Sequence, residues 1–378
     1  MRLYRGLNLL YNINYGGRLS RLVTQPDQGF GDRREVKAAL VSEPNAIEVV
    51  DVPDPSPKLG HVVVQVRATS ICGSDLNGFR GINPRNRLPN ILGHEIAGTI
   101  VSVGADVRTI MVGERVVIEP NVCCRRCEWC RAGLPNVCDT YRVLGESMEV
   151  PGGLAEFVSV AADQVYPLPD NVSADVGAVV QPLSICYHGV VNRARVSADE
   201  TVVILGAGPI GLGCLMLARY QGARVIITDI SDHRLDVARG FGAEATLRAD
   251  EGDIASAVRD LTRGRGADVT IEAVGGAQDQ TIADAVGATA TRGRIVVMGT
   301  FGKTPQPMPG YYFKNHEQTI MGAHGHPGAF APTLDLVSSG AIRPVDLISH
   351  RFPLADVGEA FRLLGERAEG VVKVVIEQ

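Results

Sequence analysis

The stretch that decides the fold is VVILGAGPIGLG, residues 202–213. Four apolar residues form a short run typical of a buried strand, and Gly206, Gly208 and Gly211 follow in G-x-G-x-x-G spacing before an apolar helical segment. The first glycine permits a tight turn, the second lets the backbone approach a pyrophosphate, and the third allows the helix to pack closely on the strand. The N–H groups at the start of that helix favour phosphate. The stretch therefore predicts a dinucleotide-binding turn.

An acidic residue further along the chain strengthens this prediction. The next β-type run, RVIITD, ends in Asp229, which is placed to accept hydrogen bonds from the adenosine ribose and to repel a 2′-phosphate. NAD is therefore favoured over NADP. Pro209 and Ile210, between the glycines, belong to the same expected cofactor site. Arg234 lies nearby and could soften the preference for NAD.

The chain has two regions with different patterns of expected secondary structure. From about residue 195, β-type runs alternate with helix-length segments, which predicts an α/β domain with a doubly wound parallel sheet. Before about residue 170, short β-branched runs are separated by Gly and Pro, which indicates an all-β domain and favours a compact barrel. A chain of 378 residues is long enough for these two domains.

Charge and hydropathy exclude several classes of function. The net charge is −5 and the pI is about 5.9, so no electrostatic attraction to nucleic acid or to an anionic membrane is expected. No apolar run is long enough to cross a bilayer, and no secretory signal is present, so a cytoplasmic protein is expected. The Arg-containing, acid-poor residues 1–35 fit a disordered tail or a start codon assigned too early better than a transit peptide.

Five of the eight cysteines lie between Glu119 and Cys138. Four of them follow a C-x₂-C-x₂-C-x₇-C spacing that can place four thiolates around one ion: Cys124, Cys127, Cys130 and Cys138. In a reducing compartment such clusters are more often metal sites than disulfides, and four thiolates without a free position suit a structural zinc ion. A redox cluster or coincidence is the alternative. Cys123 is out of register, and the cluster itself is not expected to carry out chemistry.

A second set of metal-type donors lies in the segments SICGSDLNG and ILGHEIAG. Cys72, His94 and Glu95 offer sulfur, nitrogen and oxygen, which is a suitable donor set for a zinc ion with an open coordination position. Alone, a cysteine in a β domain is usually a packing residue, and a single histidine is usually an ordinary core residue. Their coexistence with the dinucleotide motif and the four-cysteine cluster favours a second metal site.

Together, CGSD, GHE, the four-cysteine cluster and GAGPIG resemble the zinc-dependent medium-chain dehydrogenase/reductase superfamily, on its sorbitol and threonine dehydrogenase branch. The resemblance covers about residue 36 to the C-terminus. It implies a GroES-like β-barrel catalytic domain that is interrupted by a Rossmann domain, and a catalytic zinc on Cys72, His94 and Glu95. The expected organisation is an extension (1–35), the first part of the catalytic domain (36–185), the NAD-binding domain (186–324) and a return to the catalytic domain (325–378).

The resemblance also implies a reaction. The zinc would lower the pKa of a secondary alcohol, such as a polyol or sugar alcohol, and hydride transfer to NAD would leave a ketone. Ser74 is placed to take the hydroxyl proton. Asp75 is expected to hydrogen-bond the imidazole of His94 and to hold it in place for the metal.

Two positions depart from the family pattern. The proton relay often ends in a histidine three residues after the serine, but here that residue is Asn77, so proton release through water or the cofactor ribose is expected. Gln181 stands where relatives carry Cys, Asp or Glu. Our hypothesis is that Gln181 contacts the zinc through water and, being neutral, leaves the metal a stronger Lewis acid. The alternative is that Gln181 only caps the crossover between the domains.

Other interpretations remain open from the sequence alone. A threonine-type amino-alcohol dehydrogenase and a cofactor-binding relative with weakened catalysis both fit the motifs. A zinc-ribbon nucleic-acid module would explain the cysteine cluster, but the acidic charge speaks against it. The segment 311–322 suggests an edge strand that pairs subunits, so a homodimer or homotetramer is expected by analogy. Phe79, Phe301 and Tyr312 are candidates for the lining of the substrate cleft.

Overall fold

The computed structural model describes residues 35–275, 280–300, 307–366, 368 and 370–378. It also describes the backbone of two short paired strands, β1 (Tyr11–Ile13) and β2 (Leu19–Arg21). The expected N-terminal extension otherwise lies outside the described residues, as does Phe301.

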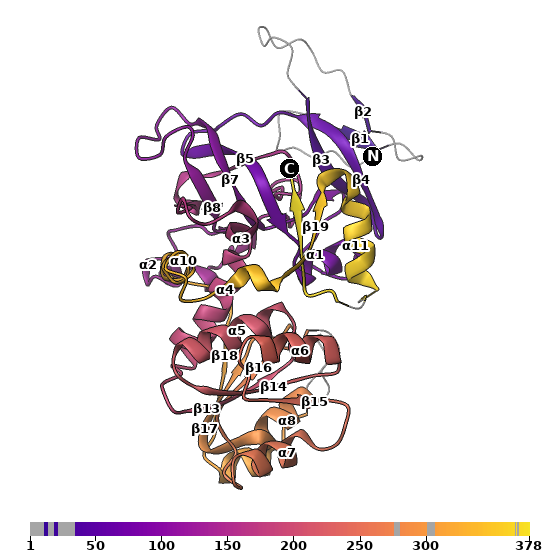
Figure 1. Ribbon diagram of the computed structural model, residues 1–378. Helices are drawn as coiled ribbons and strands as arrows, with labels where there is room; N and C mark the ends of the chain where they lie inside the picture. Colours follow the sequence, from indigo (N-terminus) through magenta and orange to yellow (C-terminus); the bar gives the residue numbers. More distant parts are fainter. Residues whose placement is uncertain are drawn as a thin grey trace.

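The parallel sheet forms the lower half of the molecule in Figure 1. Its order is β15-β14-β13-β16-β17-β18, and every neighbouring pair is parallel. Its strands are β13 (Thr201–Leu205), β14 (Arg224–Asp229), β15 (Ala245–Arg248), β16 (Ala267–Glu272), β17 (Thr289–Val297) and β18 (Thr319–Gly322), and its helices are α5 (Pro209–Tyr220), α6 (Asp232–Gly240), α7 (Ile254–Leu261), α8 (Thr281–Ala288) and α9 (Gly310–Asn315). The strand order reverses direction at β13, where dinucleotides bind in such sheets. The predicted doubly wound domain is confirmed.

The upper half of Figure 1 is mainly β structure. One sheet has the order β12-β8-β7-β5-β20-β19, with β11 also pairing with β5, and a smaller sheet has the order β4-β3-β6. The strands are β3 (Glu35–Glu43), β4 (Ala46–Pro53), β5 (His61–Ser70), β6 (Asn90–Ile91), β7 (Glu95–Val103), β8 (Arg115–Ile118), β11 (Phe157–Ala161), β12 (Val165–Pro167), β19 (Ile348–Pro353) and β20 (Lys373–Glu377), with β9 (Asn121–Val122) and β10 (Arg142–Val143) pairing separately. The expected GroES-like part is confirmed.

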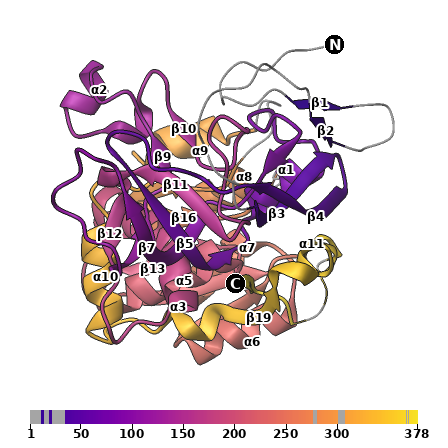
Figure 2. The ribbon, with the colours of Figure 1, turned by 90° about the horizontal axis from the view of Figure 1, so that it is seen from above.

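The end of the chain returns to the upper half of Figure 1, where the C-terminus lies. Figure 2 shows this half from above, with the C-terminus beside β19. Strand β20 pairs antiparallel with β5 and parallel with β19. Helix α11 (Val357–Gly365) packs in the same half, against β4 and β20. Helix α10 (Phe330–Ser338) follows β18 in the chain. The last residues of the chain therefore add β19 and β20 to the sheet of the first part, with β20 next to β5.

The two halves share one hydrophobic core through α3 (Ala174–Ala178) and α4 (Val180–Tyr187). Fully buried side chains from α4, from α5 and from the β sheet of the first part belong to the same cluster, including Leu183, Leu212 and Val375. Burial of this apolar surface favours a fixed arrangement of the two halves. Among the described residues, no helix has the length and apolar character that crossing a bilayer requires.

Candidate active site

Three donor atoms converge from the segment after β5 and from the start of β7. One ligand atom each of Cys72, His94 and Glu95 lies within 4.8 Å of the other two. Zinc bonds of about 2.0–2.3 Å in a tetrahedral site place ligand atoms roughly 3.3–3.8 Å apart, so this spacing suits a single ion. The three residues include one soft and one hard anionic donor and leave a fourth position free. The donor set therefore fits a catalytic zinc ion.

Asp75 holds the two segments together. It lies on α1 (Gly73–Phe79), is almost fully buried, and accepts hydrogen bonds from the Cys72 backbone N–H at 2.9 Å and the Gly93 backbone N–H at 3.2 Å. Its Oδ1 also lies 3.2 Å from Nδ1 of His94, the contact expected from the sequence. One carboxylate thus fixes the backbone around both the sulfur and the imidazole ligand.

Burial and charge set the protonation of this pair. Burial opposes ionisation of Asp75, but His94 and the two backbone N–H groups outweigh it and lower the pKa of Asp75. Burial likewise disfavours the imidazolium of His94, yet Asp75 and Cys72 raise its pKa well above the ordinary value. An imidazole made more basic by a carboxylate on its other nitrogen is a stronger metal ligand.

Glu95 has a partner that sequence reasoning missed. Its side chain is fully buried and accepts hydrogen bonds from Ser70 Oγ and from Lys373 Nζ, the latter at 2.8 Å to Oε1. Lys373 is itself almost completely buried and also donates to the carbonyl of Ile71 at 3.0 Å. The carboxylate is therefore shared between the candidate metal position and a buried ammonium group. The zinc site expected from Cys72, His94 and Glu95 did not include this cation.

A signal for Lys373 was present in the sequence. It stands inside the run VVKVVIE near the C-terminus, where a charged residue interrupts an apolar strand. A lysine in a central strand is buried only when it is paired, so the run required an acidic partner elsewhere. The sequence did not say which acid, because the pairing of β20 with β5 is a tertiary feature.

Gln181 and Ser74 are the two remaining residues that the sequence assigns to this centre. Gln181 is on α4 with 5% of its surface exposed, and its Oε1 has no hydrogen-bond partner among the described residues. The end of α3 that precedes it touches the site, since the Ala178 carbonyl lies 3.4 Å from Ser70 Oγ. Ser74 is half-buried on α1, two residues after Cys72. A buried amide oxygen without a partner calls for an explanation, and a bound water would supply one.

The four-cysteine cluster folds into a separate lobe around α2 (Glu128–Arg131). One sulfur from each of its members lies within 4.8 Å of all the others: Cys124, Cys127, Cys130 and Cys138. Cys123 is not among them. Backbone N–H groups of the lobe point at the sulfurs, including Cys124 N–H to Cys138 Sγ at 3.3 Å and Cys127 N–H to Cys124 Sγ at 3.3 Å.

The pKa values of these thiols diverge. The Cys124 N–H group lowers the pKa of Cys138 to about 6, and the Cys130 N–H group lowers the pKa of Cys127, whereas burial and the neighbouring thiols raise that of Cys130. Four sulfurs this close cannot all be anionic unless a cation lies among them. The donor set fits a structural zinc ion with no open position.

The glycines of the dinucleotide turn have the geometry that the sequence predicts. Gly206 has φ +95°, which strongly favours glycine, and a Cβ on Gly211 would lie 1.8 Å from the Gly206 carbonyl oxygen. A Cβ on Gly208 would meet no atom within 4 Å. Gly208 caps α5, which begins with Pro209 and Ile210. The open space at the helix N-terminus fits a pyrophosphate.

Asp229 ends β14 beside this turn. Its Oδ2 accepts a hydrogen bond from the Ala207 N–H at 2.8 Å, and its Oδ1 accepts one from the Ser231 N–H at 2.9 Å. A carboxylate has about four acceptor sites, so two remain for ribose hydroxyls. The Arg234 guanidinium lies 3.9 Å from Oδ2. The turn, the acid and the nearby cation are thus brought together.

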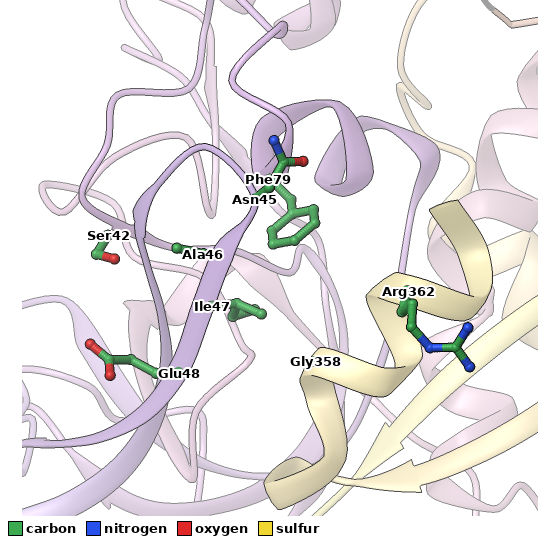
Figure 3. A pocket seen from close by; sticks show the side chains of 8 residues that line it. All are labelled: Ser42, Asn45, Ala46, Ile47, Glu48, Phe79, Gly358 and Arg362. Carbon is green, nitrogen blue, oxygen red and sulfur yellow. The ribbon is translucent and has the colours of Figure 1, made fainter. Parts of the chain in front are cut away.

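Phe79 and Tyr312, two candidates for the cleft lining, have defined aromatic partners. Phe79 packs on Phe361 with ring centroids 5.0 Å apart, and it lines a groove of about 510 Å³ between β4 and α11 (Figure 3). Tyr312 stacks on His316 and packs against the core of the parallel sheet. The sequence could not reveal these tertiary partners, and the assignment of both residues to the cleft lining stays a prediction.

Residues 58–170 match the family described as alcohol dehydrogenase GroES-like domain, and residues 209–339 match the family described as zinc-binding dehydrogenase. A sorbitol dehydrogenase of Bombyx mori is 37% identical over 349 residues, which are 90% of this chain and 97% of that protein. The chain belongs to the zinc-dependent medium-chain dehydrogenase superfamily. This dehydrogenase is therefore an oxidoreductase of the alcohol dehydrogenase type, as its motifs predicted.

Solved structures agree with this assignment. An alcohol dehydrogenase from Escherichia coli CFT073 in complex with NADH has a TM-score of 0.85 and 30% identity, covering 91% of this chain and 99% of its own. A zinc-binding dehydrogenase from Sinorhizobium meliloti 1021 bound to NADP has a TM-score of 0.86 and 31% identity, covering 92% and 100%. The same fold thus accommodates both nicotinamide dinucleotides.

Proposed function

We propose that this dehydrogenase oxidises a secondary alcohol of a polyol or related hydroxylated metabolite to a ketone, with transfer of the hydride to NAD. The observation that carries the proposal is the convergence of donor atoms from Cys72, His94 and Glu95 in a chain of this family. Similarity to a sorbitol dehydrogenase over nearly the whole of both chains supports a polyol substrate.

Cys72, His94 and Glu95 would hold the zinc ion, which when bound supplies a Lewis acid that makes an alcohol more acidic. Asp75 orients His94 and the Cys72 loop through its three hydrogen bonds. Ser74 would accept the hydroxyl proton and pass it to water or to the cofactor ribose. Half-buried Asn77, on the next turn of α1, cannot act as a base in that relay.

The residues at the dinucleotide turn favour NAD over NADP. Asp229 keeps two acceptor sites free for ribose hydroxyls, and its negative charge disfavours a 2′-phosphate. Arg234 is close enough to reduce this penalty without removing the carboxylate. We expect measurable but weaker use of NADP.

The rate of cofactor reduction at 340 nm across a substrate panel tests the proposal. The zinc-loaded enzyme is offered sorbitol and other polyols, sugar acids and L-threonine, each with NAD and with NADP. We expect the highest kcat/KM with a polyol and NAD. A clear preference for threonine would instead support the amino-alcohol alternative, and a preference for NADP would contradict the role given to Asp229.

A relative with weakened catalysis is the second candidate, because Asn77 and Gln181 replace residues that the family pattern uses. Zinc content separates the two cases. The proposed enzyme holds zinc at both groups of ligands, whereas about one zinc per chain, without turnover of any alcohol in the panel, would favour the weakened relative.

A further inference from the structure

The four-cysteine lobe is attached to the segment through which the chain leaves the parallel sheet. Asn136, in the short turn Pro135–Val137 of the lobe, is buried and donates a hydrogen bond from Nδ2 to the carbonyl of His324 at 2.7 Å. His324 lies two residues after the end of β18. A residue between two of the metal-type ligands is thus bonded to the edge of the cofactor domain.

Two further contacts make this attachment close. Gly325 has φ +65°, and a Cβ built on it would lie 2.9 Å from Cβ of Asn136, so a side chain there would displace the lobe. The ring of His324 also packs edge-on against Tyr141, with centroids 5.2 Å apart. Tyr141 in turn donates to Asn121 at 2.7 Å. The segment is held by backbone, glycine and aromatic contacts together.

The attached segment is continuous with the carboxyl edge of the parallel sheet. The Ala323 N–H donates to the carbonyl of Val297, the last residue of β17, at 2.9 Å. Two residues later, the Gly299 N–H donates to Oε2 of Glu272 at 3.2 Å, and Glu272 ends β16 as a fully buried carboxylate. Dinucleotides lie at this edge in doubly wound sheets.

We infer that Asn136 is a positioning residue for the cofactor: by holding the His324 carbonyl, the lobe fixes the β17–β18 edge of the cofactor site against the catalytic half. The inference rests on the proposed use of a nicotinamide dinucleotide. It gives the lobe a role beyond its own stability. It predicts that a substitution in the lobe weakens the binding of the cofactor.

The chain contains a reporter and a matched control for this inference. Trp129, the only tryptophan, lies in the lobe on α2 and is 41% exposed. Asn171 is exposed and donates from Nδ2 to the Ser338 carbonyl of α10, also at 2.7 Å, and among the described residues it forms no hydrogen bond to the lobe. Asn171→Ala therefore removes a hydrogen bond of the same type and length elsewhere.

The test compares wild type, Asn136→Ala, Gly325→Ala and Asn171→Ala as full-length, zinc-loaded enzymes. NADH affinity is measured by the change in NADH fluorescence, and Trp129 emission is followed during titration with NAD. Loss of one hydrogen bond is expected to raise the Kd for NADH and the KM for NAD about fivefold in Asn136→Ala, with kcat within about twofold of wild type. NAD should alter Trp129 emission in wild type and Asn171→Ala, but much less in Asn136→Ala.

Gly325→Ala acts from the other side of the contact and should raise both constants in the same direction, so it decides the matter if Asn136→Ala fails to fold. Equal zinc content in all four proteins shows that the lobe still holds its metal. The inference is overturned if the lobe variants bind NADH as tightly as Asn171→Ala. A wild type that binds neither NADH nor NADPH would instead refute the proposed function.

Discussion

Gln181 is a neutral residue at a position where the family pattern has Cys, Asp or Glu. Its amide oxygen is buried and without a partner among the described residues, although a buried acceptor normally has one. Our hypothesis that it contacts the metal site through water accounts for that free acceptor. A neutral side chain here also leaves the site with one negative charge fewer than an acidic side chain would.

Gln181→Glu tests this hypothesis. An added carboxylate near the metal should make the reacting alcohol less acidic and move the rising limb of the kcat/KM profile about one pH unit or more towards alkaline pH. The measurement is kcat/KM for the preferred alcohol between pH 6 and 10. An unchanged profile would indicate that Gln181 only caps the crossover between the domains.

At the residue scale, the expected donor atoms do converge in both groups, although their roles as zinc ligands stay predictions. The spacing of the four cysteines brings their sulfurs together locally, whereas Cys72 meets His94 and Glu95 through the pairing of β5 with β7. Lys373 and Ser70 could not be assigned because their contacts with Glu95 join three strands far apart in sequence. The environment of Phe79 depended on α11 in the same way.

At the scale of elements, β20 decides how Glu95 is held. The strand crosses from the end of the chain to lie beside β5, and it brings Lys373 opposite the loop that carries Cys72. A buried carboxylate left without its cation is costly, because neither water nor another charge compensates it. A zinc ion held by Glu95 would therefore share this buried anion with Lys373.

Lys373→Met should destabilise the metal-depleted protein by about 3–5 kcal/mol and the zinc-loaded protein by clearly less. The measurement is the midpoint of thermal unfolding with a chelator and with added zinc. Arg351→Met is the control, since Arg351 forms ion pairs with Asp175 and Glu377 but is 38% exposed, where such pairs contribute about 0–1 kcal/mol. Equal losses with and without zinc would mean that the metal does not share Glu95.

At the scale of the whole molecule, buried polar groups lie where the two halves meet. His326 follows β18 and is 1% exposed, with its Nδ1 3.6 Å from Glu119 of the catalytic half. Burial lowers the pKa of His326 to about 3, and burial, helped by Arg193 and His324, lowers that of His188 to about 4. Both imidazoles are neutral in the folded protein at neutral pH.

This arrangement predicts a loss of stability in mild acid. The unfolded chain binds a proton at His326 near pH 6.5, while the folded chain resists it down to about pH 3, so stability falls as the pH drops through this window. Between pH 7.5 and 5.5, wild type should lose about 1 kcal/mol more than His326→Gln, as measured by urea unfolding. Parallel pH dependence of the two proteins would contradict a neutral, buried His326.

The overall architecture was predictable because each half has its own sequence rhythm, and the glycine turn with Asp229 identifies the parallel sheet. The expectation that the end of the chain returns to the first half came from the family resemblance rather than from periodicity. The attachment of the lobe to the segment after β18 was not foreseeable, because it depends on one asparagine and one glycine that match no motif.

The central claim is that Cys72, His94 and Glu95 hold the metal ion on which alcohol oxidation depends. The most direct test is the zinc content per chain of Cys72→Ser, with Cys123→Ser as the matched control from outside both ligand groups. We predict that wild type and Cys123→Ser contain about two zinc ions per chain, and that Cys72→Ser contains about one and no longer oxidises the alcohol. Full zinc content and activity in Cys72→Ser would contradict the claim.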